Sequence, residues 1–249
     1  MSSTIKVLVW DEAPPHAPRS IYPNSINGAI AESLNKLGAG SIQATAVNLD
    51  DPSQGITAGS LEQADVLIWW GHARHGDVSD ETVALVVNAV NNGLGFIPLH
   101  SAHYSKPFKA VLNCSGDLTG GWREATNPVD SEEITVAAPK HPIAEGIDNF
   151  VLPEEEMYGA PFGIPSPEVI IFQSHFPLGG EYFPSFVTTV GPGIDPTFTC
   201  GDGNGQNRGH GLGRVFYFRP GHETYPTYFD ANVQRVIKNA VVWSARRRS

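Results

Sequence analysis

Residues 95–104, Gly-Phe-Ile-Pro-Leu-His-Ser-Ala-His-Tyr, decide the fold of this chain. The apolar run at 96–99 follows a glycine, which is typical of a central strand that is buried on both faces of a parallel sheet. His100, Ser101 and His103 come at the point where this strand must turn into the next helix. Ligands of open α/β sheets bind at the carboxyl ends of the strands, so this turn is a candidate functional site.

Strand and helix patterns alternate before this segment. Residues 6–10, 41–49 and 65–70 predict three further strands. Apolar residues at helical spacing predict helices at 25–37 and at 79–91, the second with a serine at its N-cap position. The short β-α-β connections favour parallel strands with right-handed crossovers. We therefore expect an α/β fold with a doubly wound, mostly parallel sheet.

The middle third of the chain is rich in glycine, proline and aromatic residues. A short helix is predicted at 106–113, and short strands are predicted at 132–138, 149–152, 168–173 and 182–190. We expect these strands to be antiparallel additions to the parallel sheet.

The final part of the chain returns to the sheet. Residues 214–219 predict a strong strand and residues 232–245 a closing helix. The glycine-rich segment 191–213 is typical of a surface insertion, and no G-x-x-x-x-G-K motif occurs, so no nucleotide cofactor is expected. Without a repeat or a linker, residues 1–249 are expected to form one domain.

Composition limits the classes of partner. A formal charge of −10 disfavours nucleic acids and anionic membranes, and no apolar run reaches the length of a membrane helix. The N-terminus enters a strand almost directly, which predicts a cytoplasmic protein without a signal peptide. The two cysteines, Cys114 and Cys200, form no CxxC pair, so neither a disulfide framework nor a thiolate zinc site is indicated.

Four motifs resemble the trehalose-utilisation (ThuA) family: Trp-Trp-Gly-His at 69–72, Pro-Leu-His-Ser-Ala-His at 98–103, His-Pro-Ile with Gly-Ile at 141–147, and Tyr-Phe-Arg-Pro-Gly-His-Glu at 217–223. The resemblance extends over residues 6–243. It implies a class I glutamine amidotransferase-like fold with a flavodoxin-like sheet, and a role in sugar catabolism on a small carbohydrate such as a trehalose-derived keto-disaccharide.

One departure from the amidotransferase pattern restricts the chemistry. His100 stands at the position of the elbow cysteine of the amidotransferases. Without a thiolate nucleophile a thioester cannot form, so glutaminase activity is not expected. The resemblance then implies an isomerase or hydrolase of carbohydrates. The alternative is a non-catalytic sugar-binding or assembly protein on the same scaffold.

Five histidines follow three predicted strands and should meet at one edge of the sheet: His72, His75, His100, His103 and His222. In one interpretation, His72, His75 and His103 bind a divalent metal, with zinc favoured, and Glu223 or Glu155 orients a ligand or acts as a base. In the other no metal is present, and His100 or His222 transfers protons with Ser101 or Glu223. The repeated His-x-x-His spacing favours the metal.

Three residues are predicted to bind the sugar. Trp122 lies in a loop where its indole can stack on a ring, Arg219 ends a strand beside the site, and Tyr225 can contribute to a polar rim. The exposed aromatic middle region is also compatible with a homo-oligomer.

Several of these residues have simpler structural explanations. His72 and His75 can cap the helix that starts near residue 79, and Ser101 can bond the backbone at the turn. The acidic run 154–156 could place one carboxylate over the site, but such a run is more typical of a solvated face. The remaining histidines are interpreted as surface or turn residues: His16, His141, His175 and His210.

Overall fold

One large sheet organises the computed structural model, which describes residues 4–124, 127–180, 182–195, 197 and 211–245. Within these residues nine strands follow the order β2-β1-β3-β4-β11-β10-β9-β6-β7. The first five are mutually parallel, and their order is that of a flavodoxin-like doubly wound sheet. The parallel strands are β1 (Ile5–Asp11), β2 (Ile42–Asn48), β3 (Val66–Trp70), β4 (Gly95–Leu99) and β11 (Gly213–Tyr217). The α/β fold expected from the sequence is confirmed.

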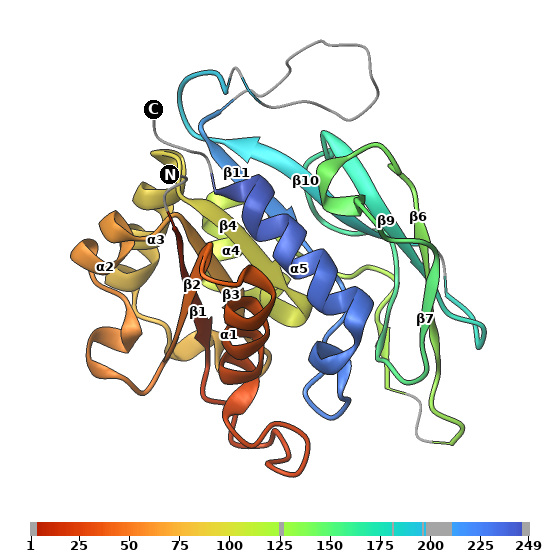
Figure 1. The fold of residues 1–249 in the computed structure, drawn as a ribbon. Coiled ribbons are helices and arrows are strands. Elements are labelled where there is room, and N and C mark those ends of the chain that lie inside the picture. Colours follow the sequence, from red (N-terminus) through yellow and green to blue (C-terminus); the bar gives the residue numbers. More distant parts are fainter. Residues whose placement is uncertain (1–3, 125–126, 181, 196, 198–210, 246–249) are drawn as a thin grey trace.

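Helices cover both faces of the parallel strands (Figure 1). On one face α1 packs beside α5, and on the other α3 contacts both α2 and α4. The helices are α1 (Ser25–Gly38), α2 (Ala58–Gln63), α3 (Asp80–Asn91), α4 (Lys106–Leu112) and α5 (Ala231–Ser244). Short 3-10 helices lie in the connecting segments: η1 (Pro52–Gly55), η2 (His75–Asp77), η3 (His100–Tyr104), η4 (Pro142–Ala144) and η5 (Thr227–Phe229).

The predicted helices α1 and α3 form where their apolar spacing placed them. The Ser79 side chain accepts a hydrogen bond from the Thr82 backbone and starts α3, as the sequence indicated. The helix α2 was not predicted, because its six residues are too short for a clear apolar period. Instead, Thr57 and Ser60 define it through a reciprocal capping box.

The middle third extends the sheet with antiparallel strands, as expected. Strand β10 pairs antiparallel with β11 and β9, and β6 pairs antiparallel with β9 and β7. These strands are β6 (Glu132–Val136), β7 (Phe150–Leu152), β9 (Val169–His175) and β10 (Phe183–Val190). A separate two-stranded ribbon joins β5 (Trp122–Arg123) to β8 (Met157–Tyr158). Most of the predicted insertion at 191–213, with Cys200 and His210, lies outside the described residues.

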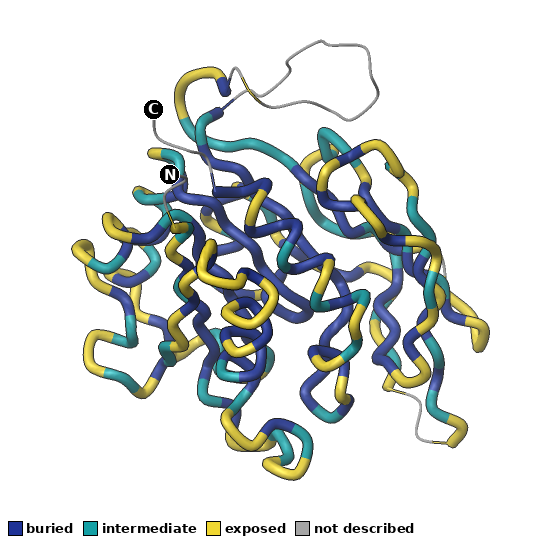
Figure 2. The backbone as a smooth tube through the Cα atoms, in the orientation of Figure 1, coloured by how far each residue is buried: buried dark blue, intermediate teal, exposed yellow. Residues whose placement is uncertain are grey.

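The core lies in two apolar layers, one on each face of the sheet. Figure 2 shows the parallel strands as the most continuously buried part of the chain. Trp10 and Trp69 stack with ring centroids 3.7 Å apart in one layer, and Trp70 lies in the other, so all three are core residues. None of the described helices is long and apolar enough to cross a membrane.

His141, interpreted from the sequence as a turn residue, begins η4 by accepting the Ile143 N–H at Nδ1. Burial against Trp243, together with the charge of Arg214, lowers the pKa of His141 to about 4. The imidazole of the unfolded chain titrates near 6.5 and therefore binds a proton before the buried ring does. The stability of the fold that depends on a neutral His141 is thus fully present above pH 6.5 and is lost as the pH falls towards 4.

His141→Asn keeps a capping acceptor but removes the titrating ring. The variant is therefore expected to lose less stability than wild type between pH 7 and pH 4.5, by up to about 3 kcal/mol. Urea denaturation at both pH values measures this difference, and His175→Asn, at a half-exposed position, is the control. Equal losses in wild type and His141→Asn would contradict the prediction.

Candidate functional site

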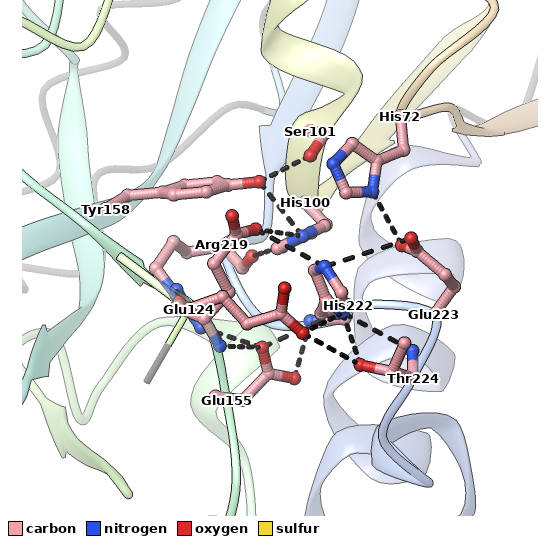
Figure 3. Close-up of polar contacts among 12 residues, drawn as sticks. His72, His100, Ser101, Glu124, Glu155, Tyr158, Arg219, His222, Glu223 and Thr224 are labelled. Atoms are coloured by element: carbon pink, nitrogen blue, oxygen red, sulfur yellow. Dashed lines mark hydrogen bonds and ion pairs between the residues drawn. The ribbon is translucent and has the colours of Figure 1, made fainter. Parts of the chain in front are cut away.

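Three histidines meet at the carboxyl edge of the parallel sheet. His72 follows β3, His100 follows β4, and His222 lies in the loop after β11 (Figure 3). Their ring centroids are 5.9 Å apart for His72 and His100, 5.1 Å for His72 and His222, and 5.6 Å for His100 and His222. One nitrogen from each ring lies within 4.8 Å of the others, which suits binding of one metal ion. The convergence expected from the sequence is therefore present for these three rings.

His100 occupies a strained turn between β4 and η3. Its φ is +51°, a left-handed conformation that is uncommon for a residue with a Cβ and costs on the order of 1–3 kcal/mol. The His100 backbone N–H donates to the carbonyl of Phe218 at 2.8 Å, which ties the turn to the end of β11. The surrounding sheet thus holds the imidazole in the site.

The loop that carries His222 is held from below by a buried carboxylate. Glu155 accepts the backbone N–H of Gly221 at 2.9 Å and that of His222 at 3.4 Å. Gly221 has φ +133°, and a Cβ there would come within 2.0 Å of the Tyr228 hydroxyl oxygen. Only glycine therefore lets the loop pass Tyr228 and present His222 to the site.

The contacts of the Nδ1 atoms define which nitrogens face the shared space. His72 Nδ1 lies 2.6 Å from a carboxylate oxygen of Glu223, and His100 Nδ1 lies 3.0 Å from the carbonyl oxygen of Arg219. Both partners can only accept, so both Nδ1 atoms carry a proton and each Nε2 keeps its lone pair in the neutral ring. His222 Nδ1 contacts the Thr224 hydroxyl at 2.7 Å and its backbone N–H at 3.3 Å, which leaves either tautomer open.

Glu223 links two of the loops through its two oxygens. One oxygen pairs with His72, and the other lies 2.7 Å from His16 Nε2. Burial alone would raise the pKa of Glu223, but the hydrogen bond from His72 and the charge of His222 lower it to about 2. Burial opposes protonation of His72, yet the hydrogen bond to Glu223 outweighs it and raises the pKa of this imidazole.

A second carboxylate, that of Glu156, faces the rings from the position just before β8. Glu156 Oε2 lies 3.1 Å from His100 Nε2 and 3.9 Å from His222 Nε2, and it has no hydrogen-bond partner among the described residues. The Tyr158 hydroxyl lies 2.9 Å from His100 Nε2 and also contacts the Ser101 hydroxyl. Ser101 thus bonds a side chain in the pocket wall.

Burial shifts the pKa values of these groups in opposite directions, since it favours the neutral form of each group. It lowers the pKa of His100 well below the usual range, with help from the charges of His222 and Arg219. Burial also raises the pKa of Glu156 and, with the charge of Glu156, raises that of Tyr158 well above its usual value. The site therefore combines a neutral imidazole, a phenol that stays protonated and a carboxyl group that gains a proton more easily than usual.

Two of the predicted metal ligands lie apart from this group. His103 is buried and its Nδ1 bonds the carbonyl of Gly116 at 2.7 Å, while His75 lies in η2 with burial lowering its pKa to about 4. Neither belongs to a metal-compatible group among the described residues. Of the predicted set His72, His75 and His103, only His72 belongs to the metal-compatible group of three histidines, which His100 and His222 complete. His103 instead lines the neighbouring pocket.

Arg219 is not positioned to contact a substrate. Its guanidinium is fully buried and pairs with Glu132 at 2.6 Å and Glu155 at 3.2 Å. The partner required by a buried arginine is thus supplied from inside the protein. Arg219 supports the floor of the site, and its predicted role in substrate binding is corrected to a positioning role.

A pocket of about 410 Å³ opens over His72 and His222, while the fully buried His100 is not part of its lining. Trp122 lines it and is 65% exposed, so its ring is accessible to a ligand. Tyr225 is buried beside His222, with ring centroids 5.4 Å apart, and is not part of the lining. The remaining lining residues are His16, His72, Ala73, Ser101, His103, Tyr104, Leu118, Glu124, Glu156, Tyr158, His222, Glu223 and Thr224.

Four site residues were not identified from the sequence. His16 was interpreted as a surface residue, although its position after the first strand was a signal for the same sheet edge. Glu12 accepts the backbone N–H groups of residues 72–74 at 2.7–2.9 Å and fixes that loop. Glu156 lies in the acidic run that could place one carboxylate over the site, but the run was given the simpler interpretation of a solvated face, and Tyr158 follows shortly after it.

Comparison with known proteins adds a family and two similar folds. The family model described as trehalose utilisation (ThuA) matches residues 6–244. No curated protein matches the sequence. A ThuA-like protein from Bacteroides uniformis is 18% identical, with a TM-score of 0.62 and coverage of 98% of this chain and 93% of its own. A ThuA-like protein from Parabacteroides merdae is 14% identical, with a TM-score of 0.61 and coverage of 98% and 90%.

Proposed function

The chain belongs to the ThuA (trehalose utilisation) family, and from this premise we propose that it is a carbohydrate-processing enzyme. It isomerises or hydrolyses a keto-sugar, such as a keto derivative of a trehalose-like disaccharide. The chemistry is acid–base catalysis by the histidine cluster, assisted by a divalent metal ion, with zinc favoured.

The observation that carries this proposal is the arrangement of donors in the cluster. His72 and His100 each bind a protein acceptor through Nδ1, which leaves the Nε2 lone pair as the ligand atom, the usual pattern for metal-binding histidines. At His100 the Tyr158 hydroxyl lies 2.9 Å from this Nε2 atom. The buried Glu156 oxygen without a hydrogen-bond partner faces the Nε2 atoms of His100 and His222. A carboxylate beside imidazole lone pairs is favourable only with a cation or a proton between them. His72, His100 and His222 therefore fit a divalent ion, and Glu156 lies beside them.

The chain's own groups supply the remaining chemistry. A bound divalent ion would polarise a carbonyl oxygen or lower the pKa of bound water. Glu223 orients His72, and the strained turn orients His100. Tyr158 keeps its proton and, beside Ser101, can donate a hydrogen bond to a substrate oxygen. The raised pKa of Glu156 suits a group that accepts a proton and returns it.

The pocket supports a carbohydrate as substrate. Its volume of about 410 Å³ lies in the range of small-molecule sites. Polar groups line its floor, while Trp122, Tyr104 and Leu118 offer apolar contact at its side. Sugars present hydroxyl groups at their edges and C–H groups on their ring faces, so both surfaces find matching partners.

Metal removal tests the proposal. Purified protein is expected to contain about one divalent ion per chain by elemental analysis. Dialysis against a chelator is expected to lower turnover of a keto-disaccharide by at least about 100-fold, and adding zinc back is expected to restore it. A mock-dialysed sample is the control.

The possible results separate the two chemistries. If turnover persists without any bound metal, the histidines act by acid–base catalysis alone and the metal has no part in the reaction. Full activity in metal-free protein that also carries His100→Ala and His222→Ala would contradict the enzyme assignment at this site.

A further inference from the structure

The β5–β8 ribbon forms one wall of the pocket. Trp122 pairs with Tyr158 and Arg123 with Met157, so the next pair along brings Glu124 opposite Glu156. Side chains alternate between the two faces of a strand. Trp122, Glu124, Glu156 and Tyr158 accordingly share the face towards the pocket, and all four line it.

Nearby arginines are turned away from this wall or buried beneath it. Arg123 lies on the other face of the ribbon, where it pairs with Asp130 at 2.6 Å and donates to the carbonyl of Gly179. Arg219 is enclosed below the floor by its two glutamates. Among the described residues, the pocket lining contains three glutamates and four histidines but neither lysine nor arginine. A phosphate or carboxylate on a substrate would find no arginine or lysine partner there.

Glu124 differs from the other two carboxylates of the lining. Glu156 and Glu223 are 4% and 3% exposed and face the histidine cluster, whereas the Glu124 side chain is 37% exposed. Its nearest polar contacts are the Thr224 hydroxyl at 3.5 Å and His222 Nδ1 at 4.0 Å (Figure 3). Glu124 thus presents its charge at the open side of the pocket, in the path of a ligand.

We propose that this pocket selects uncharged sugars over phosphorylated or carboxylated ones, and that Glu124 determines this selectivity. The inference rests on the proposed function only in taking this pocket as the sugar site. Glu124 accepts hydrogen bonds from neutral hydroxyl groups and repels an anionic substituent. For unit charges ~6 Å apart in a partly hydrated pocket, the repulsion is worth roughly tenfold in affinity.

Binding of a matched pair of sugars tests the inference. Trehalose and trehalose 6-phosphate are titrated into the wild type, Glu124→Gln and Glu154→Gln by calorimetry. Glu154 is exposed and outside the pocket lining, so Glu154→Gln makes the same change in net charge away from the site. The wild type is expected to prefer trehalose, and Glu124→Gln to reduce the ratio of the two Kd values by about tenfold. Glu154→Gln is expected to keep the wild-type ratio.

Salt provides a second measurement. Raising the ionic strength is expected to weaken the preference in the wild type and to have little effect on it in Glu124→Gln. An unchanged ratio in Glu124→Gln, an equal change in Glu154→Gln, or no binding of either sugar to the wild type would overturn the inference. Turnover of keto-disaccharides is measured in parallel. Selective binding without turnover would reject the enzyme function but support the selectivity. Turnover by the wild type, with the same ratio of Kd values in Glu124→Gln as in the wild type, would support the enzyme function but reject the selectivity.

Discussion

Arg219→Met is expected to lower the free energy of unfolding by about 3–5 kcal/mol, the largest stability effect predicted for this chain. The guanidinium is fully buried and is shared by Glu132 and Glu155, two carboxylates that are themselves buried. Removing the cation leaves both carboxylates in the interior without a charged partner. The effect on folding distinguishes this positioning role from the substrate contact that the sequence predicted.

Urea denaturation at neutral pH measures the loss. Lys106→Met is a suitable control, because Lys106 pairs at the surface with Asp80, whose side chain is 94% exposed, and should lose less than about 1 kcal/mol. Adding Glu132→Gln to Arg219→Met is expected to recover part of the stability, since it removes one of the uncompensated charges. A loss in Arg219→Met no greater than that in Lys106→Met would contradict this account of the buried network.

Alanine at position 72, 100 or 222 is expected to reduce bound metal from about one ion per chain to a small fraction, and turnover by at least about 1,000-fold. Each substitution removes one of three nitrogens that lie within 4.8 Å of one another. His75→Ala and His103→Gln are expected to keep the metal, because these rings lie outside that group. The five variants therefore compare the histidine cluster of the structure with the ligand set predicted from the sequence.

Elemental analysis after gel filtration gives the metal content, and circular dichroism confirms that each variant is folded. Retention of metal in the His100 and His222 variants, together with its loss in the His75 and His103 variants, would restore the ligand set expected from the sequence. Retention of metal in all five folded variants would place the ion elsewhere in the chain.

Much of the fold could be predicted because its signals are local. The strand β4 is a short apolar run after a glycine, and α3 begins at a serine cap and repeats valines at helical spacing. Such patterns follow from side-chain periodicity and capping, which depend on neighbours in the chain. The helix α2 gave no such pattern, since six residues are fewer than two helical turns.

The site was only partly predictable for a related reason. Strand ends identified His72, His100 and His222 as residues of one sheet edge, because parallel strands share an edge. Which histidine of each His-x-x-His pair joins the cluster of three depends on the turn that follows the strand, such as the left-handed backbone at His100. Spacing along the sequence carries no information on that direction.

By itself, the sequence determined the α/β class, the parallel strands, the antiparallel additions and the edge at which reactive side chains collect. Periodicity, caps and strand ends are properties of short segments, so they can be recognised directly from the local sequence. Only the tertiary structure decided that Glu156 and Tyr158 lie against the histidines, that Arg219 is enclosed by glutamates, and that Glu124 lines the pocket. These contacts join segments tens of residues apart, and their geometry depends on how the whole sheet packs.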